Sequence, residues 1–201
     1  MQFVPFEDDI EVNGQTVYSV VNGFAIFKKV PSDILLTLGI GRPGADGIVV
    51  VEPNEWIPQE LWLRAFKEIS EVIGAGALYG IGLQIPECAF FPPWVTDVHS
   101  AIRSVDVAYH LNHRRAGRVM FDPETNRMEE GIGHYGYMPI AGEPRILVKC
   151  TNPYPCDFDK GILTAMARRF ASRAWVDHLE PDKCRKRGGD ACTYLITWGD
   201  D

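Results

Sequence analysis

The sequence predicts an α+β protein in which helices pack on an antiparallel sheet. Helical periodicity lies mainly in the first half of the chain, where apolar residues recur at intervals of four, three and four residues between Trp62 and Ile73. Strand patterns lie mainly in the second half, in residues 145–151 and in the closing pair 174–180 and 192–198. Helices and strands that are separated along the chain in this way are typical of α+β folds.

The first half of the chain also contains two poorly defined segments. Residues 13–39 are apolar without a clear period, and Ser32, which follows a proline, marks the start of a short helix. The run 47–52 is rich in β-branched residues and predicts a strand before the periodic helix. A Gly/Ala-rich stretch, 74–82, and a proline-bounded loop, 85–94, follow that helix and are assigned to neither a helix nor a strand.

Two further helices and a hairpin are expected between the loop and the end of the chain. Thr96 can cap a helix that runs to about Arg114, with an apolar face of Val98, Ile102, Val105 and Tyr109. Residues 117–140 predict a strand, a turn at Asp122-Pro123 and a second strand. Asp157 can cap the last helix, with Phe158, Ile162, Met166 and Phe170 on one face.

The composition is that of an ordinary globular protein. A chain of 201 residues, 46% hydrophobic and 23% charged, can fold without cross-links, and we expect one domain over 1–201 in which 1–46 is a less regular extension. The net charge of −7 argues against nucleic acid and membrane surfaces as partners, since both attract basic proteins. The acidic start differs from a signal peptide, and no apolar run reaches about 18 residues. We therefore expect a soluble, cytoplasmic protein.

Four of the five cysteines lie in two short segments, "CTNPYPC" at 150–156 and "CRKRGGDAC" at 184–192. Thiols stay reduced in the cytoplasm, where clustered cysteines more often bind metal than form disulfides. Zinc accepts four thiolates from two rigid loops, so the candidate ligands are Cys150, Cys156, Cys184 and Cys192. Separately buried thiols and a redox pair are the alternatives, and the basic run 185–187 would lower thiol pKa values in either a metal site or a redox site.

The segments "NPYPCDFDKGILTAMARRF" and "VDHLEPDKCRKRGGDACTYLITW" resemble the C-terminal half of 4-vinyl reductase (V4R) domains. These are ligand-sensing modules of phenol-responsive bacterial activators and of bacteriochlorophyll biosynthesis, related in fold to haem nitric-oxide-binding domains and to a Golgi transport-complex subunit. The resemblance is specific over 145–198 and follows the order of elements over 47–198. It implies an antiparallel sheet covered by helices, in agreement with the residue patterns.

The resemblance also implies a structural zinc ion and a small-molecule pocket. Cys184 and Cys192 match the family's cysteine pair, and Cys156 stands near its third cysteine. Pro181 occupies the position of the family's acidic ligand, which leaves the fourth ligand open among Cys150, Glu180 and Asp182.

The candidate ligand-binding residues are Trp94, His99, Tyr109 and His110, which offer flat apolar surface and hydrogen-bonding nitrogens. The alternative places Trp94 and Tyr109 in the core and makes a solvated helical stripe of His99, Arg103, Asp106, His110 and His113. Histidines one turn apart on that stripe, with Asp106, are a minor candidate for a metal site.

We expect a sensory or regulatory domain that binds a small, largely apolar or aromatic molecule and acts through a homodimer or a signalling partner. A zinc-stapled interaction module, a vinyl-reductase-like enzyme and a haem sensor are the alternatives. Haem is disfavoured because 150–159 lacks the arginine of a Tyr-x-Ser-x-Arg clamp and carries two acids that would repel propionates. Enzymatic activity is not the expectation, because no GxGxxG or Walker A pattern marks a cofactor site. The aromatic segments "HYGY" (134–137) and "NPYP" (152–155) and a Cys156 nucleophile keep the enzyme alternative open.

Overall fold

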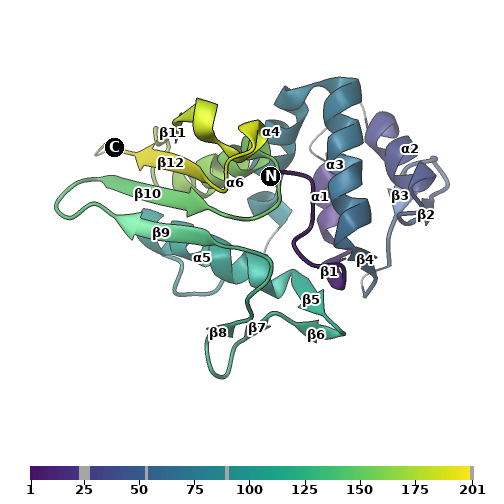
Figure 1. Ribbon diagram of the computed structural model, residues 1–201, viewed down its shortest axis with the longest axis horizontal. Helices are drawn as coiled ribbons and strands as arrows, with labels where there is room; N and C mark the ends of the chain where they lie inside the picture. Colours follow the sequence, from purple (N-terminus) through teal and green to yellow (C-terminus); the bar gives the residue numbers. More distant parts are fainter. Residues whose placement is uncertain (23–27, 53, 89–90, 200–201) are drawn as a thin grey trace.

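The structure is a computed structural model that describes residues 1–22, 28–52, 54–88 and 91–199 (Figure 1). Its described helices are α1 (Thr16–Asn22), α2 (Lys29–Thr37), α3 (Gln59–Ile73), α4 (Ala75–Gln84), α5 (Val98–Leu111) and α6 (Cys156–Arg168). Its described strands form two four-stranded sheets and two short two-stranded pairs.

The larger sheet is formed by the second half of the chain. It consists of β9 (Tyr135–Pro139), β10 (Arg145–Cys150), β11 (Trp175–Leu179) and β12 (Cys192–Thr197) in the antiparallel order β11-β12-β10-β9. Burial alternates strictly along β12, where Cys192, Tyr194 and Ile196 face the core. Helices α5 and α6 lie behind this sheet in Figure 1, so its inner face is covered by helices. The predicted α+β fold, with helices on an antiparallel sheet, is confirmed.

The smaller sheet joins the start of the chain to its middle. It has the order β4 (Trp56–Pro58), β1 (Ile10–Asn13), β5 (His113–Arg115) and β6 (Arg118–Val119). The two short pairs are β2 (Arg42–Pro43) with β3 (Val49–Val50), and β7 (Phe121–Asp122) with β8 (Arg127–Met128). The strand predicted over 47–52 is therefore shortened to two residues.

Helix starts differ by a residue or two from the prediction. The cap of α5 is Asp97 rather than Thr96, because the Asp97 carboxylate accepts a hydrogen bond from Ser100 N at 2.7 Å. In return, the Asp97 N–H donates to the Ser100 hydroxyl at 3.0 Å. Helix α6 begins at Cys156, one residue before the predicted Asp157 cap. Helix α3 ends before Gly74, whose φ of 105° favours glycine.

The Gly/Ala-rich stretch after Gly74 is a helix, α4, which the sequence did not predict. Its Gly82 faces Gly161 of α6, and a Cβ on Gly82 would lie 2.2 Å from the backbone oxygen of Phe158. Glycine lowers helix propensity by about 1 kcal/mol, but here it lets two helix backbones touch. Tertiary packing therefore outweighs propensity in α4.

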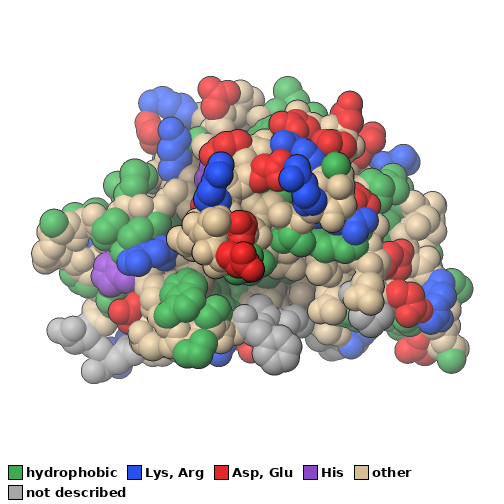
Figure 2. Space-filling view, turned by 90° about the horizontal axis from the view of Figure 1, so that it is seen from below, with side chains coloured by type: hydrophobic (Ala, Val, Ile, Leu, Met, Phe, Trp, Pro, Cys, Tyr) green, Lys and Arg blue, Asp and Glu red, His purple; other side chains and the backbone are tan. Residues whose placement is uncertain are grey.

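None of the helices in the described ranges combines the length and apolarity that a membrane crossing requires. Acidic and basic side chains are interspersed on the face seen in Figure 2, without a broad basic surface there.

Candidate ligand cavity and cysteine cluster

An apolar cavity of about 100 Å³ lies between α3, α5, α6 and β1. It is somewhat smaller than an engineered cavity of about 150 Å³ that binds benzene. Its lining is mostly apolar and aromatic: Val12, Thr16, Trp62, Ile85, Pro86, Phe91, Ser104, Val105, Ala108, Tyr109, Asn112, His113, Tyr135, Tyr154, Phe158, Ile162 and Met166. The space is therefore suited to a molecule of about one aromatic ring.

The three tyrosine hydroxyls of the lining donate their hydrogens to acceptors within the protein. The Tyr109 hydroxyl donates to Ile132 O at 2.7 Å, and the Tyr135 hydroxyl donates to Asp159 Oδ1 at 2.6 Å. His113 Nδ1 lies 2.7 Å from Tyr109 O, which can only accept, so Nδ1 carries the hydrogen and Nε2 accepts from the Tyr154 hydroxyl at 2.9 Å. The three phenol oxygens are left with free lone pairs and no free proton.

Burial keeps these groups neutral. It raises the pKa of the Tyr109, Tyr135 and Tyr154 phenols and lowers the pKa of His113 to about 4. At neutral pH the cavity therefore presents neutral phenols and a neutral imidazole. A ligand that donates a hydrogen bond would find acceptors there. A carboxylate ligand would be repelled, because its oxygens would face the lone pairs of the phenol oxygens.

Only Tyr109 among the four predicted ligand-binding residues lines this cavity. Trp94 is 46% exposed, His99 bonds the Tyr137 hydroxyl at 2.8 Å, and His110 lies on the other side of α5, beside Asp106. The alternative of a solvated stripe does not hold for His110 and His113, which are buried, although Tyr109 lies in the core as that alternative expects.

Sequence reasoning missed His113, Tyr135 and Tyr154 as cavity residues. Tyr135 and Tyr154 belong to the aromatic segments at 134–137 and 152–155, which were noted as candidate site residues but were not placed. The three side chains come from different elements, β5, β9 and the β10–α6 connection, so their convergence depends on the fold.

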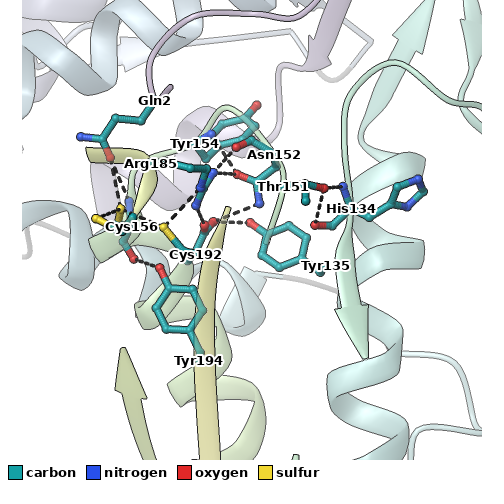
Figure 3. A network of polar contacts seen from close by, with 12 residues as sticks. Gln2, His134, Tyr135, Thr151, Asn152, Tyr154, Cys156, Arg185, Cys192 and Tyr194 are labelled. Atoms are coloured by element: carbon teal, nitrogen blue, oxygen red, sulfur yellow. Dashed lines mark hydrogen bonds and ion pairs between the residues drawn. The ribbon is translucent and has the colours of Figure 1, made fainter. Parts of the chain in front are cut away.

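A buried ion pair lies beside the cavity (Figure 3). Arg185, 1% exposed, pairs with the fully buried Asp159 and donates to the side-chain oxygen of Asn152 at 2.7 Å. Arg185 Nε also points at the Cys192 sulfur, 3.3 Å away. The first residue of the basic run is therefore part of the core.

Three of the four predicted metal ligands converge. The Cys156 sulfur lies 3.2 Å from that of Cys192 and 3.9 Å from that of Cys184. Two sulfur ligands of a tetrahedral site with metal–sulfur bonds of about 2.3 Å stand roughly 3.8 Å apart, so the spacing is compatible with a shared ion. The fourth member of the group is His178, whose ligand atom lies within 4.8 Å of the others.

Cys150, Glu180 and Asp182 are not in this group. Cys150 pairs with Cys192 across the β10–β12 ladder and is fully buried, while both acids are exposed. Cys150, Cys156, Cys184 and Cys192 are free thiols. The Cys156 and Cys192 sulfurs share a hydrogen bond in which either can donate, and this bond lowers the pKa of the Cys192 thiol and raises that of Cys156.

No protein-family model and no curated protein matches the chain. Solved structures do share its arrangement of elements. An H-NOX protein from S. oneidensis in the Fe(II) ligation state is 15% identical, with 93% of this chain and 96% of that chain covered and a TM-score of 0.61. An oxygen-binding H-NOX domain related to soluble guanylate cyclases is 16% identical, with 94% and 95% covered and a TM-score of 0.61. A mutant of the T. tengcongensis H-NOX protein is 16% identical, with 94% and 98% covered and a TM-score of 0.63.

The chain has the H-NOX fold. This confirms the predicted likeness in fold to haem nitric-oxide-binding domains, while membership of the V4R family stays a prediction.

The prediction that zinc is the cofactor and haem is disfavoured is wrong. Solved structures that share this fold come from work on haem distortion in the H-NOX family and on the control of haem redox potential, so the fold points to haem. The argument from repulsive acids also fails. Asp159 is neutralised by Arg185, Asp157 is partly exposed near Lys186, and neither carboxylate lines the cavity.

The lining of this chain's cavity does not fit haem in the described arrangement. Haem requires an axial ligand to its iron and partners for two propionate carboxylates. Both nitrogens of His113 are occupied, and the described lining contains no lysine or arginine. The cavity of about 100 Å³ is also below the roughly 300–1,000 Å³ of pockets for drug-sized ligands. The shared fold and the local residues therefore point to different ligands.

Proposed function

We propose that the chain is a sensory domain that binds a neutral, largely apolar molecule of about one aromatic ring. The observation that carries this proposal is an apolar cavity in which the tyrosine hydroxyls have already donated their hydrogens and can only accept. A hydroxyl or amine on the ligand would donate to Tyr109 or Tyr154, and a carboxylate would be rejected. The H-NOX fold supports a sensory role without fixing the ligand.

The wider setting is part of the same proposal. The chain would act as one V4R-type domain over residues 1–201, in the cytoplasm, and would pass ligand binding to a partner protein or to a second copy of itself. The positions of cavity-lining residues on α5 and α6 support this, because both helices pack directly on the larger sheet.

Calorimetric titration of the purified chain tests the ligand class. We expect phenol to bind and benzoate, of similar size but anionic, not to bind. We expect Tyr109→Phe to weaken phenol binding by about threefold to tenfold, since a hydrogen bond contributes about 0.5–1.5 kcal/mol. Tyr137→Phe is the matched control, because Tyr137 lies outside the cavity and should leave the affinity unchanged.

The same titration decides between this proposal and the haem sensor that the fold favours. Stoichiometric uptake of haem, seen as a Soret band that phenol does not displace, would contradict a one-ring ligand. Equal affinity for phenol and benzoate would contradict the acceptor-only cavity.

We further propose that a structural metal ion, of a kind that thiolates bind well, is held by Cys156, Cys184, Cys192 and His178. The ion would join α6 to the segment before β12 and to β11. Four protein ligands leave no open position for water, so no hydrolytic role follows.

Removal of one sulfur tests this metal site. We expect Cys184→Ser to lose the bound ion and to lower the melting temperature together, because metal binding and folding are coupled. Cys150→Ser, outside the group, should keep the ion, as measured by elemental analysis of protein purified from its host. Unchanged metal content in Cys184→Ser would remove Cys184 from the site.

A further inference from the structure

A second group of metal-ligating side chains lies on the side of α5 that faces away from the cavity. Asp106, His110 and His134 each offer a ligand atom within 4.8 Å of the others. Glu130 extends the group toward solvent, since its side chain is 84% exposed and lies 3.1 Å from His134 Nε2. The group shares no residue with the cysteine cluster or with the cavity lining.

His110 carries a buried nitrogen without a partner. Its Nδ1 lies 2.8 Å from Asp106 O, a carbonyl that can only accept, so Nδ1 holds the hydrogen and Nε2 holds a lone pair. The residue is 0% exposed, and Nε2 has no hydrogen-bond partner. An unsatisfied buried polar group costs about 1–3 kcal/mol, so this nitrogen requires an explanation.

Metal-ligating histidines have this arrangement. Their second ring nitrogen donates to a carbonyl or carboxylate, which fixes the tautomer and aims the free lone pair at the metal. The backbone oxygen of Asp106 has that role for His110, and the Tyr135 N–H fixes the Asp106 carboxylate by donating to Oδ1 at 2.9 Å. Two of the three ligands are therefore held by the fold.

His134 is the accessible ligand. Its ring stands 4.8 Å from that of His110, centroid to centroid, and its nitrogens face Asp106 Oδ2 at 3.0 Å and Glu130 Oε2 at 3.1 Å. Its side chain is 31% exposed, so an ion can arrive from solvent. In Figure 3 the ring of His134 points away from the cysteine network.

We propose that Asp106, His110 and His134 bind a divalent first-row transition metal ion, with Glu130 at the open side of the site. Two imidazole nitrogens and one carboxylate form a donor set that first-row metals accept readily. The ion replaces a proton between His134 and the carboxylates, and it gives His110 Nε2 its missing partner.

Cobalt(II) binding to the full chain tests the proposal. Equilibrium dialysis of wild type and His134→Asn, followed by elemental analysis, should give one cobalt ion fewer per chain in the variant. Without metal, the variant should show the wild-type circular dichroism spectrum and a modestly lower melting temperature, because it loses the contacts of His134 with Asp106 and Glu130. Cobalt bound by thiolates absorbs strongly in the near ultraviolet, and that absorption should be the same in both proteins, which separates this site from the cysteine cluster.

His99→Asn is the matched control, because His99 lies on α5, as Asp106 and His110 do, but outside the group. It should bind as much cobalt as wild type. Equal cobalt content in wild type and His134→Asn would overturn the proposal, and so would an equal loss in His99→Asn, which would indicate unspecific binding to surface histidines.

Discussion

Arg185→Met is expected to destabilise the protein by about 3–5 kcal/mol, the usual cost of removing one partner of a buried ion pair. Asp159 would remain in the core without its counter-charge, and both partners are fully buried. Arg185 also donates to the Asn152 side chain and to the Cys192 sulfur, so these acceptors lose their donor too. Chemical denaturation, monitored by circular dichroism, measures the loss.

The loss should depend on pH in a defined direction. Burial raises the pKa of Asp159 to about 6 even beside Arg185, and removal of the guanidinium raises it further. A carboxyl whose pKa is higher in the folded state than in the unfolded state stabilises the fold when protonated, and that contribution is lost as pH rises through the folded pKa. Arg185→Met should therefore be less impaired at pH 5 than at pH 8, relative to wild type.

Two variants control for other effects of the substitution. Lys186→Met removes the next side chain, which is 53% exposed and 3.9 Å from Asp157, and should change stability by less than about 0.5 kcal/mol. The double variant Arg185→Met/Asp159→Leu removes both charges and should recover part of the loss. If Arg185→Met proved no more harmful than Lys186→Met, the ion pair would not contribute as the structure indicates.

The strands of the larger sheet could be predicted because their signal is local. Residues of β10 and β12 alternate between core and surface, and turns separate the strands. The convergence of Cys184 and Cys192 could also be predicted, since the two residues flank the Gly188-Gly189 turn between the last two strands, which pair antiparallel. The place of His178 in that group was missed, because it depends on the stacking of His178 on Tyr194 in the neighbouring strand.

The cavity could be predicted only in part, because α5 is buried on two sides. The face with Val105 and Tyr109 lines the cavity, while the polar face with Asp106 and His110 packs against β9 and the segment before it. A helix with one apolar and one polar face is normally read as half solvated. Here the polar face finds partners within the protein, and no periodicity in α5 reveals them.

Helix α4 was missed because its glycines lower helix propensity, while the packing against α6 that stabilises it is not visible in the sequence. The variant Gly161→Ala, in α6, tests whether this close packing is the reason for the glycines. A Cβ on Gly161 would lie 2.3 Å from Tyr79 O and 2.9 Å from Gly82 Cα, and backbone atoms cannot turn aside as a flexible side chain can. We expect a net loss of up to about 2 kcal/mol, since backbone contacts this short place the cost at the upper end of the about 1–3 kcal/mol typical of overpacking, against a gain of about 1 kcal/mol in helix propensity. The measurement is again the free energy of unfolding.

Gly76→Ala is the control within the same helix pair. A Cβ on Gly76 meets nothing within 4 Å, so this variant should gain up to about 1 kcal/mol. Opposite signs for the two glycine substitutions would assign the effect to the helix crossing rather than to glycine in general. A stabilising Gly161→Ala would contradict the close approach of α4 and α6.

The crossing also connects stability to function. Phe158 and Ile162 line the cavity within one turn of Gly161, and Ile85 lines it just beyond α4. Forcing the two helices apart must therefore displace cavity walls, so Gly161→Ala should weaken phenol binding as well as the fold. Gly76→Ala should leave phenol affinity unchanged. A Gly161→Ala protein that is destabilised but binds phenol with wild-type affinity would show that the ligand does not occupy this cavity.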